Sequence, residues 1–557
     1  MTPQYECEMN TMENDQIRGL VVDIHRKRIY PGILNISDGR IQSITETDEK
    51  VSPFFILPGF IDAHVHIESS MLVPSEFARL AVRHGTVATV SDPHEIANVL
   101  GVKGVEFMIE NGLTVPFKFY FGAPSCVPAT TFETAGATID LDDIRYLLDQ
   151  PEILYLSEMM NWPGVLHRDP VVMDKINASL QLGKPVDGHA PGLTGSDALR
   201  YGEAGISTDH ECYTLQEALD KLEAGMKIII REGSAARNFE ALIPLMEKYS
   251  EHLMFCSDDK HPDELITGHI NELVRESVRL GYDLFDVLRV ACVNPVDHYG
   301  LQVGVMRIGD PADFVMVRDL VNFEVLETYI DGNKVFGEHG IGFSTSEPPI
   351  LNRFDCQPIS MGDIQISTPG QRMRIIEALD GEIITKSSRV PAFRNSEGAL
   401  ISNTEEDILK IVVVNRYQNA KPAVAFIRGF GLKTGAIAST IAHDSHNLIA
   451  VGANDEAIVK CINNLIEVQG GISVVSGSEE YTLPLPVAGL MSTRPGEEIA
   501  REYKRLDLAA KQMGSTLRAP FMTLSFMALL VIPELKLSDL GLFDGRSFAF
   551  ADLVEHS

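Results

Sequence analysis

The chain has 557 residues, more than one hydrophobic core usually serves, so we expect two or three domains. Its formal net charge of −31 at pH 7 repels phosphate backbones, which excludes nucleic acid as an expected partner. The hydrophobic fraction of 45% is ordinary for a globular protein.

The N-terminal segment and the cysteines indicate in which cellular compartment the protein is expected. Residues 1–18 are polar and acidic without an apolar run, so no signal peptide is expected. The seven cysteines are scattered, odd in number and without a CxxC pair, which argues against a disulfide framework and against a thiolate zinc site. The apolar stretch 521–532 ends before Pro533 and is too short to span a bilayer. We expect a cytoplasmic protein in a reducing compartment, with no membrane partner.

Two short segments of β character lie at either side of a long central region. Residues 17–50 contain an apolar run and the hairpin turn Ser37-Asp38-Gly39-Arg40. A matching stretch follows from 309 to 330 and ends in the turn Asp331-Gly332-Asn333. We expect 1–55 and 298–347 to pair into one small β-sandwich.

The central region alternates short apolar runs with longer amphipathic stretches, which predicts an α/β fold with a parallel sheet. Strands are expected at 56–66, 85–91, 116–122, 152–158, 184–189, 205–210, 226–231 and 252–258. Helices are expected between them, at 74–83, 98–111, 140–149, 170–182, 214–224 and 262–280, with Ser75, Asp140 and Thr214 as capping residues.

Eight such units fit a TIM (β/α)8 barrel over 56–297. An open doubly wound sheet is the alternative, and it is weakened because no glycine-rich phosphate loop follows the first strand. The composition stays globular beyond about residue 348, so 348–557 is expected to form an additional C-terminal α/β domain.

The first predicted strand ends in two histidines at alternate positions. Side chains in a strand alternate faces, so His64 and His66 point the same way and together can hold a metal ion. Four more polar residues stand at the ends of predicted strands four, five, six and eight, and these ends converge on one mouth of a barrel. They are Glu158, His189, His210 and Asp258.

The order of these residues, together with the run Pro58-Gly59-Phe60-Ile61-Asp62 before His64, resembles the amidohydrolase superfamily. The resemblance implies that His64, His66 and Asp258 bind one divalent ion, that His189 and His210 bind a second, and that Glu158 bridges both. Many relatives carry a carboxylated lysine at the bridge, where this chain has Glu158. With no cysteine ligand, manganese is favoured, and ferrous iron or zinc are alternatives.

Further segments are similar to adenine deaminases of the bacterial type, and this similarity runs over essentially the whole chain. They are His66–Met71, Ser91–Asn98, Cys256–Pro262, Ile441–Asn447, Leu485–Ser492 and Pro520–Phe526. The implied reaction is hydrolysis of adenine to hypoxanthine and ammonia, in which a metal-bridging hydroxide attacks C6. Asp258 is the expected proton shuttle, with Glu158 and His210 beside it at the reacting centre.

Other polar residues are candidates for the substrate site. Asp92, His94, Glu95 and Asp259 are expected to bind the purine, although Asp92 would otherwise only shape a turn and Asp259 would cap a helix. Glu68 is either a partner of a ligating imidazole or a solvated acid. The cluster of His443, Asp444 and His446 would cover the barrel mouth, bind an accessory metal or form a polar turn. Arg231 and Glu232 are expected to form a structural ion pair.

Two other functions remain as alternatives. A cyclic-amide hydrolase of the dihydroorotase or hydantoinase kind would use the same ligands, but these relatives generally carry lysine at the bridge and lack the C-terminal domain. A non-catalytic scaffold would show gaps in the ligand set, and none is present. Relatives of this fold are commonly multimeric, so a homo-oligomer is expected.

Overall fold

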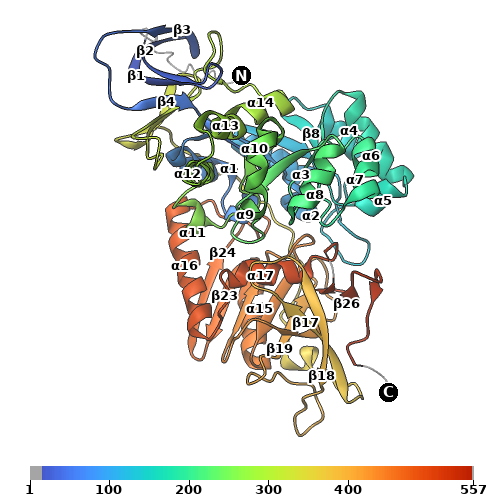
Figure 1. The fold of residues 1–557 in the computed structure, drawn as a ribbon. Helices are drawn as coiled ribbons and strands as arrows, with labels where there is room; N and C mark the ends of the chain where they lie inside the picture. Colours follow the sequence, from blue (N-terminus) through green and yellow to red (C-terminus); the bar gives the residue numbers. More distant parts are fainter. Residues whose placement is uncertain (1–14, 533, 555–557) are drawn as a thin grey trace, which may run out of the picture.

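The computed structural model describes residues 15–532 and 534–554. Cys7, Pro533 and most of the segment considered for a signal peptide lie outside these ranges. Within them, no helix has the length and apolar character needed to cross a membrane. Figure 1 shows three parts, with a central helix-covered barrel between a β-sheet near the N-terminus and a C-terminal α/β part.

The two segments that flank the barrel form one eight-stranded sheet. Its strands lie in the order β16-β15-β14-β13-β4-β1-β2-β3. They are β1 (Asp15–Asp23), β2 (Arg28–Ser37), β3 (Arg40–Glu46), β4 (Phe55–Pro58), β13 (Phe314–Val317), β14 (Val325–Ile330), β15 (Asn333–Gly337) and β16 (Gly340–Ile341).

Both predicted hairpin turns in this sheet are present. The β2–β3 turn places Asp38 and Gly39 at φ of 52° and 71°, the left-handed region that a tight hairpin requires. At its far edge, the Ile41 amide donates to the Asp310 carbonyl at 3.0 Å, so the sheet curls back on itself. Leu34 and Phe314, from the two halves, share its core. The two segments expected to pair into one small β-sandwich thus form one continuous, curled sheet with a shared core.

The first predicted barrel strand divides at Gly59. Residues 55–58 form β4 in the flanking sheet, and the barrel begins with β5 (Phe60–Val65). A Cβ at Gly59 would lie 2.3 Å from Val87 Cγ1, so only glycine fits where the chain passes from one sheet to the other. The prediction of one strand over 56–66 is wrong because a continuous apolar run does not reveal this change of sheet.

The central strands have parallel partners throughout and give a TIM-barrel-like α/β arrangement. A bridge between Val65 and Asp258 joins the first and last strands, and the Ser207 amide donates to the Val186 carbonyl at 2.8 Å on the other side of the ring. The remaining strands are β6 (Thr86–Ser91), β7 (Lys118–Ala123), β8 (Ile153–Met159), β9 (Val186–Gly188), β10 (Thr208–Asp209), β11 (Lys227–Arg231) and β12 (Leu253–Cys256).

Helices alternate with these strands. The main ones are α1 (Pro74–Ala81), α2 (His94–Leu100), α3 (Val102–Gly112), α4 (Leu141–Leu148), α6 (Pro170–Gln181), α7 (Gly195–Glu203), α8 (Leu215–Glu223), α11 (Pro262–Leu265) and α12 (Ile270–Arg279). Asp140 and Thr214 cap α4 and α8 as predicted. Ser75 is not a cap, because α1 begins at Pro74, and proline is well suited to the first helical position.

The C-terminal part packs helices on a second eight-stranded sheet, in the order β18-β17-β20-β19-β22-β21-β23-β24. The apolar face of α15 (Asp455–Val468) covers this sheet, and α16 (Gly496–Gln512) lies against α11 of the barrel (Figure 1). The strands are β17 (Arg372–Ala378), β18 (Thr385–Pro391), β19 (Leu409–Val414), β20 (Ala423–Arg428), β21 (Ala436–Ser439), β22 (Leu448–Gly452), β23 (Gly471–Ser476) and β24 (Glu479–Pro484). A small sheet follows α17 (Pro520–Ser525), with β25 (Leu535–Ser538), β26 (Gly541–Asp544) and β27 (Ala549–Phe550).

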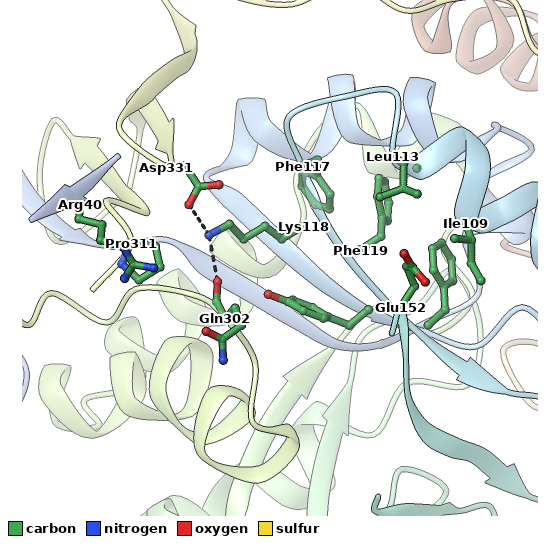
Figure 2. A pocket seen from close by; sticks show the side chains of 13 residues that line it. Arg40, Ile109, Leu113, Phe117, Lys118, Phe119, Glu152, Gln302, Pro311 and Asp331 are labelled. Carbon is green, nitrogen blue, oxygen red and sulfur yellow. Dashed lines mark hydrogen bonds and ion pairs between the residues drawn. The ribbon is translucent and has the colours of Figure 1, made fainter. Parts of the chain in front are cut away.

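A cavity of about 340 Å³ opens where β7 and β8 begin, next to the flanking sheet (Figure 2). Lys118 crosses it and donates to Asp331 at 2.8 Å, to Asp313 at 2.7 Å and to the Gln302 carbonyl at 2.9 Å. These bonds neutralise the lysine and tie the barrel to the sheet. Residues at this N-terminal end of the strands normally stabilise a TIM barrel, whereas the active site lies at the C-terminal end of the strands.

Candidate active site

The histidine pair at the end of β5 faces the barrel mouth. His64 and His66 are 0% and 4% exposed, and their Nε2 atoms lie 3.2 Å apart, so both imidazoles point the same way. Asp258, just after β12, places Oδ1 3.5 Å from His64 Nε2 and 3.2 Å from His66 Nε2. Three donors from the first and last strands therefore form one group.

Glu158 joins this group to a second one. Its Oε2 lies 2.8 Å from His189 Nδ1 and 3.1 Å from His210 Nε2, while its Oε1 lies 3.6 Å from His66 Nε2. Burial raises the pKa of the Glu158 carboxyl, but the imidazoles of His189 and His210 outweigh burial and hold the pKa well below its ordinary value. The carboxylate is thus ionised between the two groups, as a bridging ligand must be.

The donor set fits divalent metal ions. Four imidazoles and two carboxylates supply the nitrogen and oxygen ligands that such ions accept, and their donor atoms converge closely enough to surround ions. His66 Nδ1 lies 3.1 Å from the Asp92 carbonyl oxygen. A proton held there leaves the Nε2 lone pair directed at the centre, which is the usual arrangement of a ligating histidine.

Two further charged residues complete the mouth: Arg231, which was expected to be structural, and Glu211, which was not predicted. Arg231, the last residue of β11, donates through Nη1 to Asp258 Oδ2 at 2.5 Å and through Nη2 to Glu211 Oε2 at 3.0 Å. Burial raises the pKa of the Asp258 carboxyl, but Arg231 and the hydrogen bonds from the two histidines of β5 outweigh this and hold it well below its usual range.

The expected pair of Arg231 with Glu232 is wrong. Successive side chains point to opposite faces, so Arg231 points to the site while Glu232 lies 3.3 Å from Arg237 outside it. The sequence offered one signal that Arg231 and Glu211 belong to the site, which is their position. Arg231 ends the seventh barrel strand and Glu211 directly follows His210, so both stand at the barrel mouth.

The loop after β6 meets a turn of the C-terminal part. His94 Nδ1 lies 3.0 Å from Asp92 Oδ2 and 3.4 Å from Glu158 Oε1. Glu95 Oε1 lies 2.5 Å from His443 Nδ1, and its other oxygen contacts His446 Nε2. We call the residues gathered here the interdomain cluster; they are Asp92, His94, Glu95, His443, Asp444 and His446. All are buried, and His94, Glu95, His443 and Asp444 line the cavity at the barrel mouth.

The remaining candidates act at the edge of the site. Asp259 Oδ1 accepts a hydrogen bond from Ser69 Oγ at 2.5 Å, and Asp259 does not cap the following helix, whose N-cap is His261. Glu68 is neither an imidazole partner nor a solvated acid. It is 2% exposed and accepts from the Ile96 amide in the first turn of α2, and burial raises its pKa to about 7.

We call the candidate ligands together the metal-ligand group; they are His64, His66, Glu158, His189, His210 and Asp258. Free space beside this group is small, with a cavity of about 30 Å³. One side of it is polar and is made by the residues described above. The other is apolar and combines two barrel residues with three from the C-terminal part; they are Met160, Ala236, Ile383, Phe526 and Leu529. The C-terminal part therefore contributes both polar groups and an apolar surface to the same site.

The sequence matches known families over both parts that build this site. The amidohydrolase family model matches residues 55–335, and the adenine deaminase C-terminal domain model matches 382–549. The chain is 54% identical to an adenine deaminase of Salinibacter ruber over 96% of this chain and 98% of that protein. Identity is 55% to that of Sulfurovum sp. (96% and 99% covered) and 50% to that of Methanosarcina mazei (96% and 98%). The chain therefore belongs to the adenine deaminase family, within the amidohydrolases.

Proposed function

We propose that this protein hydrolyses adenine to hypoxanthine and ammonia at the mouth of the barrel. The observation that carries the proposal is the nearly full-length similarity to adenine deaminases. It is supported by overlapping groups of nitrogen and oxygen donors at the barrel mouth, of which one contains His64, His210 and Asp258 and another contains Glu158, His189 and His210. The C-terminal part, which matches the adenine deaminase model, lines the same cavity.

We also propose bounds for the three domains. The sequence predicted domain boundaries at 55/56, 297/298 and 347/348; with β4 in the flanking sheet, we infer a closed (β/α)8 barrel from β5 to residue 297, a domain built from the chain up to β4 and from 298–347, and a C-terminal domain over 348–557. We also infer that the protein forms a homo-oligomer, because relatives of this fold are commonly multimeric.

Two divalent ions are proposed at the centre, with manganese favoured over ferrous iron or zinc. His64, His66 and Asp258 would hold one ion and His189 and His210 the other, with Glu158 shared. When bound, such ions lower the pKa of water so that it serves as a nucleophile at neutral pH.

The reaction requires two proton transfers. Water adds at C6 of the purine, N1 gains a proton, and the exocyclic amine must leave as ammonia rather than as amide ion. Asp258 can carry both protons, because Arg231 fixes its Oδ2 and leaves Oδ1 toward the centre. His210 and Glu158, whose Nε2 and Oε2 atoms lie 3.1 Å apart, are proposed to flank the reacting atoms.

Asp92, His94, Glu95 and Asp259 are proposed to hydrogen-bond the polar edge of the purine. The support is that all are buried beside the ligand group, and that His94 and Glu95 both line the cavity.

An absorbance assay of the manganese-loaded protein with adenine tests the proposal, because conversion to hypoxanthine shifts the ultraviolet spectrum. We expect turnover of adenine and none of dihydroorotate or a hydantoin. Turnover of a cyclic amide without turnover of adenine would replace the proposal with cyclic-amide hydrolysis.

A further inference from the structure

Lys536 is a buried cation in the small C-terminal sheet. Its side chain is 0% exposed, and no hydrogen bond or ion pair joins it to a carboxylate in the described part of the chain. The Nζ atom donates to two carbonyl oxygens, those of Ile383 at 2.6 Å and Phe526 at 2.9 Å. Burial lowers its pKa to about 7. Burying a charge in this way costs free energy. The positions of the two carbonyls that bind it therefore indicate what Lys536 does in the structure.

Both carbonyls belong to residues whose side chains line the cavity at the metal-ligand group. Ile383 lies just before β18, and Phe526 directly follows α17. The ring of Phe526 also stacks on His443 of the interdomain cluster, with centroids 5.0 Å apart and planes 23° apart. One ammonium therefore ties together two segments that are distant in sequence and that form the same apolar wall.

The size of the cavity makes the position of this wall important. Ile383 and Phe526 line this narrow cavity together with the polar residues of the site. A purine ring that binds here would pack against this wall, so a shift of the wall would alter the fit of the ring. A three-donor ammonium can bind two carbonyls at once, which an apolar side chain cannot do.

We propose that Lys536 is a positioning residue for substrate binding, which holds Ile383 and Phe526 as the apolar wall against the ring of the purine. The proposal rests on the proposed function for the identity of the ligand. Lys536 touches neither substrate nor metal ligands and acts through the two carbonyls.

The test compares Lys536→Met with Lys410→Met. Lys410 is an equally buried lysine on β19, but it pairs with Asp455 at 2.6 Å and binds the Ile364 carbonyl, and none of these three residues lines the cavity. In Lys536→Met we expect the KM for adenine to rise about tenfold, with kcat within twofold of the parent and an unchanged content of bound metal. In Lys410→Met we expect an unchanged KM. An unchanged KM in folded Lys536→Met, or an equal rise in both variants, would overturn the proposal.

A second readout does not depend on the reaction. Hydrogen exchange of backbone amides in 381–385 and 524–530 should be faster in Lys536→Met than in Lys410→Met, and equal exchange would overturn the proposal. If the parent protein does not deaminate adenine, the proposed function fails while this comparison still decides the role of Lys536. If Lys536→Met does not fold, Lys536→Gln is measured instead, with the same expected KM shift and the same contrary outcome.

Discussion

The active site has two halves that are held in place by different means. In the barrel half, the metal-ligand group stands at the ends of parallel strands, whose ladder hydrogen bonds fix the backbone from which each side chain projects. In the C-terminal half, a turn and two loops reach the site through side-chain contacts, such as Glu95 with His443 and Lys536 with two carbonyls. In the proposed mechanism the first half carries the chemistry, and the second half contributes most of the apolar side of the cavity. Changes in the barrel half should therefore abolish turnover, and changes in the C-terminal half should weaken binding.

The largest effect is expected for Glu158→Gln. Glu158 is the candidate ligand shared by both groups, so its loss should lower the content of bound metal and reduce activity more than 100-fold. This exceeds the ~10–100-fold loss that is typical when a residue that only supports a metal ligand is replaced. Metal analysis and the adenine assay measure this. Glu152→Gln, at the other end of β8, serves as the control and should retain both properties. Full turnover of metal-loaded Glu158→Gln would contradict the role of the bridge.

Asp258→Asn comes next. Loss of the proposed proton carrier should lower kcat by about 10²–10⁴-fold, the usual range for general acid–base groups, even where metal is retained. The measurement is kcat in parallel with metal content. A near-normal kcat would remove Asp258 from the shuttle role and shift attention to His94, which lies 3.4 Å from Glu158.

A smaller effect that concerns binding is expected at the junction of the two halves. Glu95→Gln removes the charge that holds His443 and His446, so the KM for adenine should rise roughly tenfold, equivalent to ~1.4 kcal/mol, with a smaller change in kcat. Steady-state kinetics separate the two parameters. A loss confined to kcat would mean that Glu95 belongs with the chemistry of the barrel half.

The last prediction concerns stability, not turnover, where the barrel meets the C-terminal part. His261 Nδ1 lies 2.6 Å from the Tyr503 hydroxyl of α16, and burial lowers the pKa of His261 to about 3. Between pH 6.5 and 3 the unfolded chain binds a proton there that the folded chain does not. The free energy of unfolding should therefore fall as pH drops through this range, by up to about 1.4 kcal/mol per pH unit.

His261→Gln should flatten this dependence in denaturant titrations at several pH values. His252→Gln, at an exposed histidine of the barrel, is the matched control. An equal pH dependence in parent and His261→Gln would show that the contact with Tyr503 does not couple the two halves to pH.

The local elements were largely predictable. Turns at 37–40 and 331–333 and caps at Asp140 and Thr214 are confirmed, because they depend on residues only a few positions apart. The division of the first barrel strand at Gly59 was not predictable, because an apolar run looks the same whichever sheet it joins.

The sequence by itself determined which residues stand at the ends of the barrel strands. Period-two alternation and the convergence of parallel strand ends bring His64, His66 and their partners together without any knowledge of distant contacts. Only the tertiary structure decided that Arg231 binds Asp258 rather than its neighbour Glu232, and that Glu95 meets His443. The physical reason is that these ion pairs join residues far apart in the chain and are selected by burial, because a buried charge must find a partner wherever packing places one.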